Sequence, residues 1–295
     1  MLRVTDQTMM QYAERNLASS QARLAAAQQA ATSGLRITRP SDDPVGTAPA
    51  LAAHAAIAAN SQYKRNIDNG TAWLNTLDNA LGNATTSLRQ VRDLVIQGAN
   101  GATTQDGRNA LADQVDALRK DLLGTANTQF MGRNVFAGTS NAATAFTDGT
   151  PPTFNGTAGD SVQRRIGPDQ TVQVDSDGSK VFGTGSSSVF GLLDKISADL
   201  RNGSVDPSKD LPALDTAMNA VINGRSDVGT RLSQLERASS ENLTAQGTLE
   251  TQRSGIEDQD TGKAILDLQL QQTNYQAALA VSAKTLQPTL MDFLK

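Results

Sequence analysis

Apolar residues recur every seven positions at both ends of the chain. Near the amino end Met10, Leu17, Leu24 and Ala31 form such a series, which is the pattern of one apolar seam along a helix. We therefore expect a helix before residue 40. A single helix is too narrow to bury its own seam, so this seam predicts a partner from the other end of the chain or from another molecule.

A longer series follows the first one. Two lines of apolar residues seven apart, one from Ile67 to Val95 and one from Tyr63 to Val91, predict a single helix over about residues 50–97. At 1.5 Å per residue this helix is a rod roughly 70 Å long. A shorter third helix is expected over residues 106–128, where apolar residues again follow a helical spacing.

The segment between the first two helices contains two prolines, Pro40 and Pro44, which make a continuous helix improbable. Asp43 is placed to cap a helix that Pro44 opens, because proline is tolerated at the first helical position. Pro49 would remove a hydrogen bond from the interior of that helix. We therefore expect regular helix to begin near Thr47.

The composition changes abruptly at Phe130. Six of the seven phenylalanines lie within residues 130–190, among glycines, threonines and short alternating runs. Alternation bounded by turn residues is typical of short strands. This stretch predicts a small β-rich module with its own aromatic core.

The seven-residue spacing returns after this module. Short helices are expected around residues 190–200 and 214–221, followed by a rod whose seam runs from Val228 to Ile256. Asn242 lies in this seam, where it is either a buried residue that fixes the helix register or a solvated one. A terminal helix follows and stops at Pro288; its apolar positions are Ile265, Leu268, Tyr275, Leu279 and Leu286.

These patterns predict a mainly α protein. Long amphipathic helices from both termini pack as a coiled-coil rod, and the small β-rich module is inserted in the middle. The expected parts are terminal assembly helices at residues 1–43 and 257–295, rod helices at 44–129 and 191–256, and the module at 130–190. Self-assembly is the natural use of terminal helices with uncovered seams.

Composition and charge narrow the function further. The net charge is −4 and no strongly basic block is present, which argues against nucleic acid as a partner. With no cysteine, the chain can form neither a disulfide nor a thiolate metal site. No secretory signal precedes the first polar residues, and no apolar stretch approaches the about 18 residues of a membrane span. We expect no membrane insertion, and export without a cleaved signal peptide.

Residues that could carry chemistry form no catalytic set. His54 is the only histidine and lies in an alanine-rich helix, where a surface or packing role is expected. Gly262-Lys263 lacks the spacing of a phosphate-binding loop. Asp175 to Gly178 resembles part of a calcium loop, but a β-turn between strands is the better interpretation. Asp42 and Asp43 are expected to cap a helix. The sequence therefore predicts no enzyme, cofactor or metal.

Three separated motifs resemble one family. Ser33 to Ile37 (SGLRI) and Arg39 to Val45 (RPSDDPV) resemble the amino-terminal signature of flagellin-like proteins, in the version used at the junction of hook and filament. Gly132 to Thr139 (GRNVFAGT) is similar to the motif at the entry to their β-rich module, and Leu286 to Leu294 (LQPTLMDFL) is similar to their carboxyl end. Filament flagellins usually have neither of the two prolines in the first signature.

The resemblance implies a structural protein of the bacterial flagellum. It implies export through the flagellar type III channel and assembly outside the cell, as a ring between hook and filament. Implied partners are copies of the chain, the first hook-associated protein, flagellin and a flagellar export chaperone. The residues expected to serve assembly are Met10, Leu17, Leu24, Pro40, Asp42, Asp43, Pro44, Ile265, Leu268, Tyr275, Leu279 and Leu286.

Three alternatives stay open at this stage. A filament flagellin is the nearest, and the two prolines and the motif at residues 132–139 disfavour it. A coiled-coil signalling protein would also show heptads, but it should carry a membrane span or a sensory module. An enzyme in the 130–190 module would need convergent polar groups in a pocket.

Overall fold

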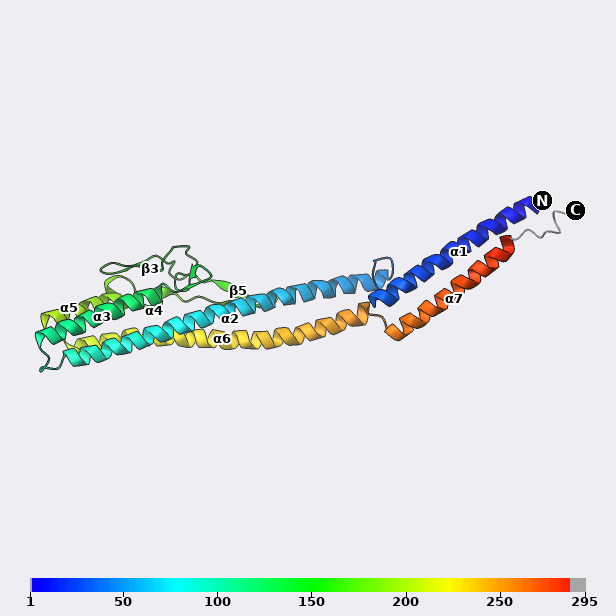
Figure 1. Ribbon diagram of the computed structural model, residues 1–295. Helices are drawn as coiled ribbons and strands as arrows, with labels where there is room; N and C mark the ends of the chain where they lie inside the picture. Colours follow the sequence, from blue (N-terminus) through cyan, green and yellow to red (C-terminus); the bar gives the residue numbers. More distant parts are fainter. Residues whose placement is uncertain (1, 287–295) are drawn as a thin grey trace. The chain divides into compact units, whose positions relative to one another are not determined.

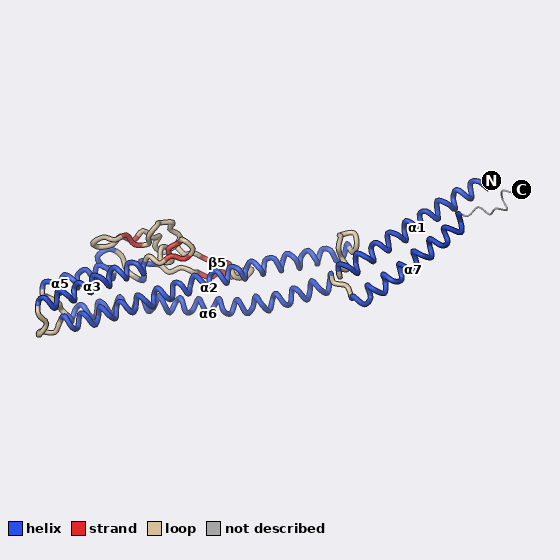
Figure 2. The backbone as a smooth tube through the Cα atoms, viewed as in Figure 1, coloured by secondary structure: helices blue, strands red, loops and turns tan. Residues whose placement is uncertain are grey.

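The computed structural model describes residues 2–286, and most of them are helical (Figures 1 and 2). The chain divides into two compact units. One comprises the residues up to 58 and those from 246 onward, and the other comprises residues 59–245. The predicted class, mainly α with a small strand-containing middle, is confirmed.

The long helices are α1 (Leu2–Ser33), α2 (Pro44–Gly98), α3 (Gln105–Ala126), α5 (Val189–Asn202), α6 (Pro207–Glu257) and α7 (Thr261–Leu286). A short helix α4 (Gly178–Val181) and a 3₁₀ turn η1 (Gly185–Ser187) precede α5. Within residues 59–245, α2, α3, α5 and α6 run side by side (Figure 1). The seam predicted for α2 is buried in this bundle. Its residues are all nearly inaccessible to solvent: Ile67, Leu74, Leu81, Leu88 and Val95.

The start of α2 differs from the sequence expectation. The helix begins at Pro44 and continues through Pro49, so the prediction of a start near Thr47 is wrong. The missing N–H of Pro49 leaves the carbonyl of Val45 without its helical donor. Both residues are exposed, so water can satisfy that carbonyl. Asp43 caps the first turn and offsets the loss.

The helix α6 also differs from the expectation. The short helix predicted around residues 214–221 is the beginning of α6, which continues unbroken to Glu257. Gly224 does not end it, because one glycine inside a helix costs only about 1 kcal/mol. A Cβ at Gly224 would lie 3.1 Å from the Val181 side chain, so this glycine lets α4 approach α6 closely.

The middle of the chain contains three small antiparallel hairpins. They pair β1 (Gln129–Phe130) with β2 (Arg133–Asn134), β3 (Phe146–Thr147) with β4 (Thr153–Phe154), and β5 (Gln163–Arg165) with β6 (Thr171–Gln173). Phe146 is the centre of an aromatic cluster, with ring centroids 5.0 Å from Phe154, 5.8 Å from Phe182 and 5.2 Å from Phe190. The predicted aromatic cluster is confirmed.

The prediction that the middle has a separate core is wrong. Its buried aromatic and aliphatic residues belong to one continuous apolar cluster with α2, α3, α5 and α6. Phe190 belongs to α5 as well as to the aromatic cluster. A polar contact ties the same parts together, since Arg119 of α3 bonds Asp148 and the carbonyl of Gly149. The hairpins therefore fold as part of the bundle.

Candidate functional site

The two terminal helices α1 and α7 pack side by side along their length (Figure 1). Leu17 and Leu24 of α1 and Leu268 and Tyr275 of α7 are half-buried in this pair. The other predicted assembly residues of these two helices with described side chains, Met10, Ile265 and Leu279, remain exposed by 50%, 48% and 42%. Leu286 is the last residue of α7, and its side chain lies outside the described part.

Further apolar side chains on this pair are exposed, and the heptad spacing did not find them. Tyr12 of α1 and Leu266, Leu270 and Val281 of α7 each expose more than half of their surface. Leu266 and Leu270 are one turn apart and follow Ile265 and Gln269, so a wider helical face would have included them. Large exposed apolar side chains are common at protein–protein contacts, so these four residues are further candidates for such a contact.

Asp43 caps α2, as the sequence predicted. Its Oδ1 accepts hydrogen bonds from the backbone N–H groups of Val45 (3.1 Å) and Gly46 (2.9 Å). Its Oδ2 lies 2.8 Å from Nη1 of Arg36. The Gly46 N–H first, and the Arg36 guanidinium second, hold the pKa of Asp43 below its usual value. Pro44 follows as the first residue of the helix.

Asp42 folds the preceding loop and does not cap α2. Its Oδ2 accepts hydrogen bonds from the backbone N–H and the hydroxyl of Thr38 (3.0 and 2.9 Å) and from the N–H of Arg39 (2.7 Å). These bonds lower the pKa of Asp42, with the Thr38 N–H as the largest cause. Pro40 lies exposed within this turn. These hydrogen bonds hold the loop in a fixed turn, called the corner below, between α1 and α2.

The end of α6 closes onto this corner. The backbone N–H of Arg36 donates to the carbonyl of Glu257 (2.6 Å), and Nη2 of Arg36 donates to the carbonyl of Ile256 (2.7 Å). The N–H of Gln259 donates to the carbonyl of Gly34 (2.9 Å). Sequence reasoning missed these contacts because their partners lie about 220 positions apart, and no local pattern joins them.

His54 is a half-exposed residue of α2 that bonds the same end of α6. Its Nε2 lies 2.8 Å from Oε1 of Glu257, whose side chain is largely buried. Arg253 also approaches Glu257, at 3.5 Å. The surface or packing role expected for His54 agrees with this position.

The Asp175–Gly178 segment is not a turn between strands. It leads from β6 into α4, and Asp177 is the N-cap of that helix, accepting from the N–H of Ser179 at 3.0 Å. The β-turn expectation is therefore wrong, although the local capping chemistry is the same. Among the described residues, no group of three histidine or acidic side chains is arranged to hold a metal ion.

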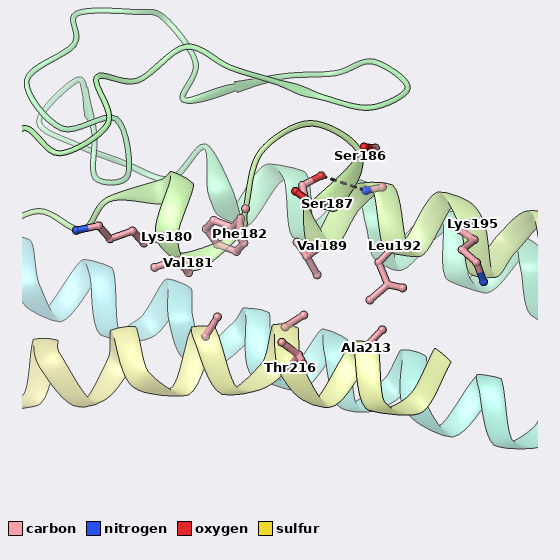
Figure 3. Close-up of a pocket in the computed structure, with 15 residues that line it drawn as sticks. Lys180, Val181, Phe182, Ser186, Ser187, Val189, Leu192, Lys195, Ala213 and Thr216 are labelled. Atoms are coloured by element: carbon pink, nitrogen blue, oxygen red, sulfur yellow. Dashed lines mark hydrogen bonds between the residues drawn. The ribbon is translucent and has the colours of Figure 1, made fainter. Parts of the chain in front are cut away.

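A groove of about 650 Å³ lies between α5 and α6 (Figure 3). Small and apolar side chains such as Leu192 and Ala213 line it, and Lys180 and Lys195 lie toward its ends (Figure 3). Lys195 is held by Asp199 and Asp210 at 2.7 and 2.8 Å. The hydroxyl groups of the groove belong to Ser186, Ser187, Ser188 and Thr216, and its lining contains no histidine or acidic residue that could serve them as a base.

Two family profiles match the chain. Residues 4–141 match the bacterial flagellin N-terminal helical region, and residues 211–294 match the bacterial flagellin C-terminal helical region. The chain belongs to the flagellin family. The profiles leave out residues 142–210, which include two of the three hairpins, α4 and α5.

Within the flagellin family, the chain is similar to hook-associated proteins along nearly its whole length. It is 27% identical to Flagellar hook-associated protein 3 of Escherichia coli K12 over 94% of this chain and 95% of that one. The same protein of Salmonella typhimurium LT2 is also 27% identical, over 96% of both chains. The crystal structure of Xanthomonas campestris FlgL shares the fold, with a TM-score of 0.62 and 19% identity over 68% of this chain and 99% of that one.

Proposed function

We propose that this chain is a structural subunit of the bacterial flagellum that joins the hook to the filament. The likeness to Flagellar hook-associated protein 3 over 94% of the chain carries the proposal. Pro40 in the corner loop and Pro44 at the start of α2 support the junction role over a filament role, because filament flagellins usually have neither proline.

The terminal helices are the proposed assembly elements. Each exposes apolar side chains that the α1–α7 pair does not cover, and copies of the chain would bury them. Fully burying one leucine side chain contributes about 1.5–3 kcal/mol, so several such residues give a stable contact. Self-association through this face requires no cofactor.

The proposed partners follow from this position. One side of the ring contacts the first hook-associated protein, and the other contacts flagellin. A flagellar export chaperone is the proposed partner before export. Export without a cleaved signal peptide and a location outside the cell complete the proposal. No described helix has the length and apolar character needed to cross a membrane.

Removal of the gene from its own bacterium tests the proposal. Cells without the chain should make hooks that carry no filament and should release flagellin into the medium. A plasmid with the wild-type chain should restore filaments. Filaments that grow normally without the chain would contradict the junction role, and a loss of hooks as well would place the chain earlier in assembly.

A further inference from the structure

A polar pocket of about 450 Å³ lies beside the corner, between α1, the loop after it and α7. Three arginines line it, namely Arg23 of α1 and Arg36 and Arg39 of the loop. Two acids, Asp42 and Asp267, share the wall. Three arginine residues in the lining of one small pocket make it a candidate site for an anion.

Two of the three guanidinium groups are unused. Arg36 bonds Asp43 and the carbonyl of Ile256, as described above. Arg23 and Arg39 make no side-chain hydrogen bond or ion pair with the groups that the structure describes. The charge of Arg39 is the smallest of the causes that lower the pKa of Asp42. Each guanidinium offers five N–H donors and accepts none.

The acids of the pocket wall do not satisfy these donors. Three hydrogen bonds from Thr38 and Arg39 already occupy Oδ2 of Asp42, and these bonds fix the turn that presents Arg39. Asp267 accepts a hydrogen bond from Gln271, one turn further along α7. The pocket thus keeps guanidinium donors for an incoming anion, and a carboxylate is an anion whose two oxygens fit a guanidinium fork.

The rim of the pocket indicates where the carboxylate comes from. Asp267 and Gln271 line the pocket, and the residues that precede them, Leu266 and Leu270, are exposed by 68% and 56%. A free inorganic anion gains nothing from apolar neighbours. An amphipathic helix with an acidic residue beside apolar ones would use both parts of this surface.

We propose that the pocket receives a carboxylate side chain from a second copy of this chain and thereby sets how neighbouring subunits meet. The inference rests on the proposed self-assembly. The chain can supply the carboxylate, because it has eight exposed acidic side chains with neither an ion pair nor a side-chain hydrogen bond in the described part: Glu14, Asp93, Asp106, Asp121, Asp169, Asp227, Glu236 and Glu241. Electrostatic complementarity of this kind fixes the register of an interface.

The double variant R23E/R39E, expressed as the only copy in the cell, tests the pocket. The matched control is R89E/R237E, which reverses two exposed, unpaired arginines outside the pocket. Electron microscopy should show an about tenfold fall in the fraction of hooks that carry filaments, equivalent to about 1.4 kcal/mol at the contact. The control should keep most filaments, and both purified chains should melt like wild type. The milder R23Q/R39Q variant should show a smaller loss in the same direction.

Charge reversal also identifies which residue of the second copy supplies the carboxylate. In the R39E background, each of the eight exposed acids is changed to lysine in turn, and one of these changes should restore filaments. Normal filaments in R23E/R39E, an equal loss in R89E/R237E, or binding of inorganic phosphate that depends on Arg23 and Arg39 without any loss of assembly would each overturn the proposal. Normal filaments in a strain that lacks the chain altogether would instead contradict the junction role itself.

Discussion

Asn60 of α2 and Asn242 of α6 hold their helices together by reciprocal hydrogen bonds. Nδ2 of Asn60 donates to the backbone carbonyl of Asn242 (3.0 Å), and Nδ2 of Asn242 donates to the carbonyl (2.9 Å) and to Oδ1 (2.7 Å) of Asn60. Both residues are buried. This pair decides between the two alternatives for Asn242, which is a buried polar residue of the seam and not a solvated one. Such a pair favours one register of two helices.

Replacement of one asparagine should cost more than replacement of both. N242L leaves Oδ1 of Asn60 buried without a donor, and we expect a loss of about 1–3 kcal/mol in the free energy of unfolding. The double variant N60L/N242L removes both polar groups and should lose less than the sum of the two single variants. Chemical denaturation of the four proteins gives the coupling energy. Additive losses would mean that the two side chains act independently.

The buried guanidinium of Arg119 should anchor the hairpins to the bundle. Its side chain is only 9% exposed and lies 3.0 Å from Asp148 and 2.5 Å from Asp194. Because both acids are partly exposed, R119M should cost about 1–3 kcal/mol rather than the full penalty of a buried unpaired charge. Hydrogen exchange should quicken around residues 146–150.

The control for Arg119 is R225M, which removes an exposed pair with Asp78. A surface ion pair contributes about 0–1 kcal/mol, so this variant should remain close to wild type. Equal losses in the two variants, or an unchanged exchange rate around residues 146–150 in R119M, would contradict the anchoring role.

Asp175 should make the protein less stable as the pH rises. Its carboxyl is fully buried, with only Oδ1 bonded, to the N–H of Val162 at 2.9 Å. Burial raises the pKa of Asp175, so the folded chain holds this proton at pH values where the unfolded chain has lost it. Stability therefore falls as the pH rises from the unfolded pKa of about 3.9 through the raised folded pKa.

The neutral variant D175N tests this linkage. It should match wild type near pH 4 and become the more stable protein toward pH 7, as measured by thermal unfolding across that range. D177N is the control with the opposite sign, because the pKa of Asp177 is lowered despite burial, by bonds from Ser179 and Gly159. D177N should lower the stability of the folded chain most above pH 4, where Asp177 is ionised, and this loss should shrink as the pH falls. A wild-type curve parallel to that of D175N would contradict a neutral Asp175.

Leu279 should matter between molecules more than within one. The side chain is 42% exposed on α7, so L279D places a charge largely in water in the single chain. We expect a change in melting temperature equivalent to less than about 1 kcal/mol, but loss of filaments in cells, where copies cover the site. A large fall in the melting temperature of the purified chain would assign Leu279 to the core of the α1–α7 pair.

The sequence predicted the helices and the corner because their signals are local. The seam of α2, the cap by Asp43 and the break at Pro40 each depend on residues within a few turns. The sequence predictions failed where the local structure depends on residues that are distant along the chain. The shared core around Phe190, the bonds of Arg36 to the end of α6, and the position of Asp177 before a helix all come from tertiary contacts.

In the candidate site, too, the sequence revealed the features with local signals and missed those that depend on tertiary contacts. Heptad spacing identified Leu17, Leu24, Leu268 and Tyr275, which the helix pair half-buries. It did not identify the exposed Leu266 and Leu270, nor the pocket with Arg23 and Arg39, because these depend on which face the paired helices leave open.

The location of the chain in an intact flagellum tests the junction role most directly. Because the chain has no cysteine, one cysteine placed at an exposed position of the module, as in T139C or A158C, can be labelled with gold through maleimide. Electron microscopy should then show label confined to a narrow band where hook meets filament, with none along the filament. Label distributed along the whole filament would contradict the junction role and make the chain a filament subunit.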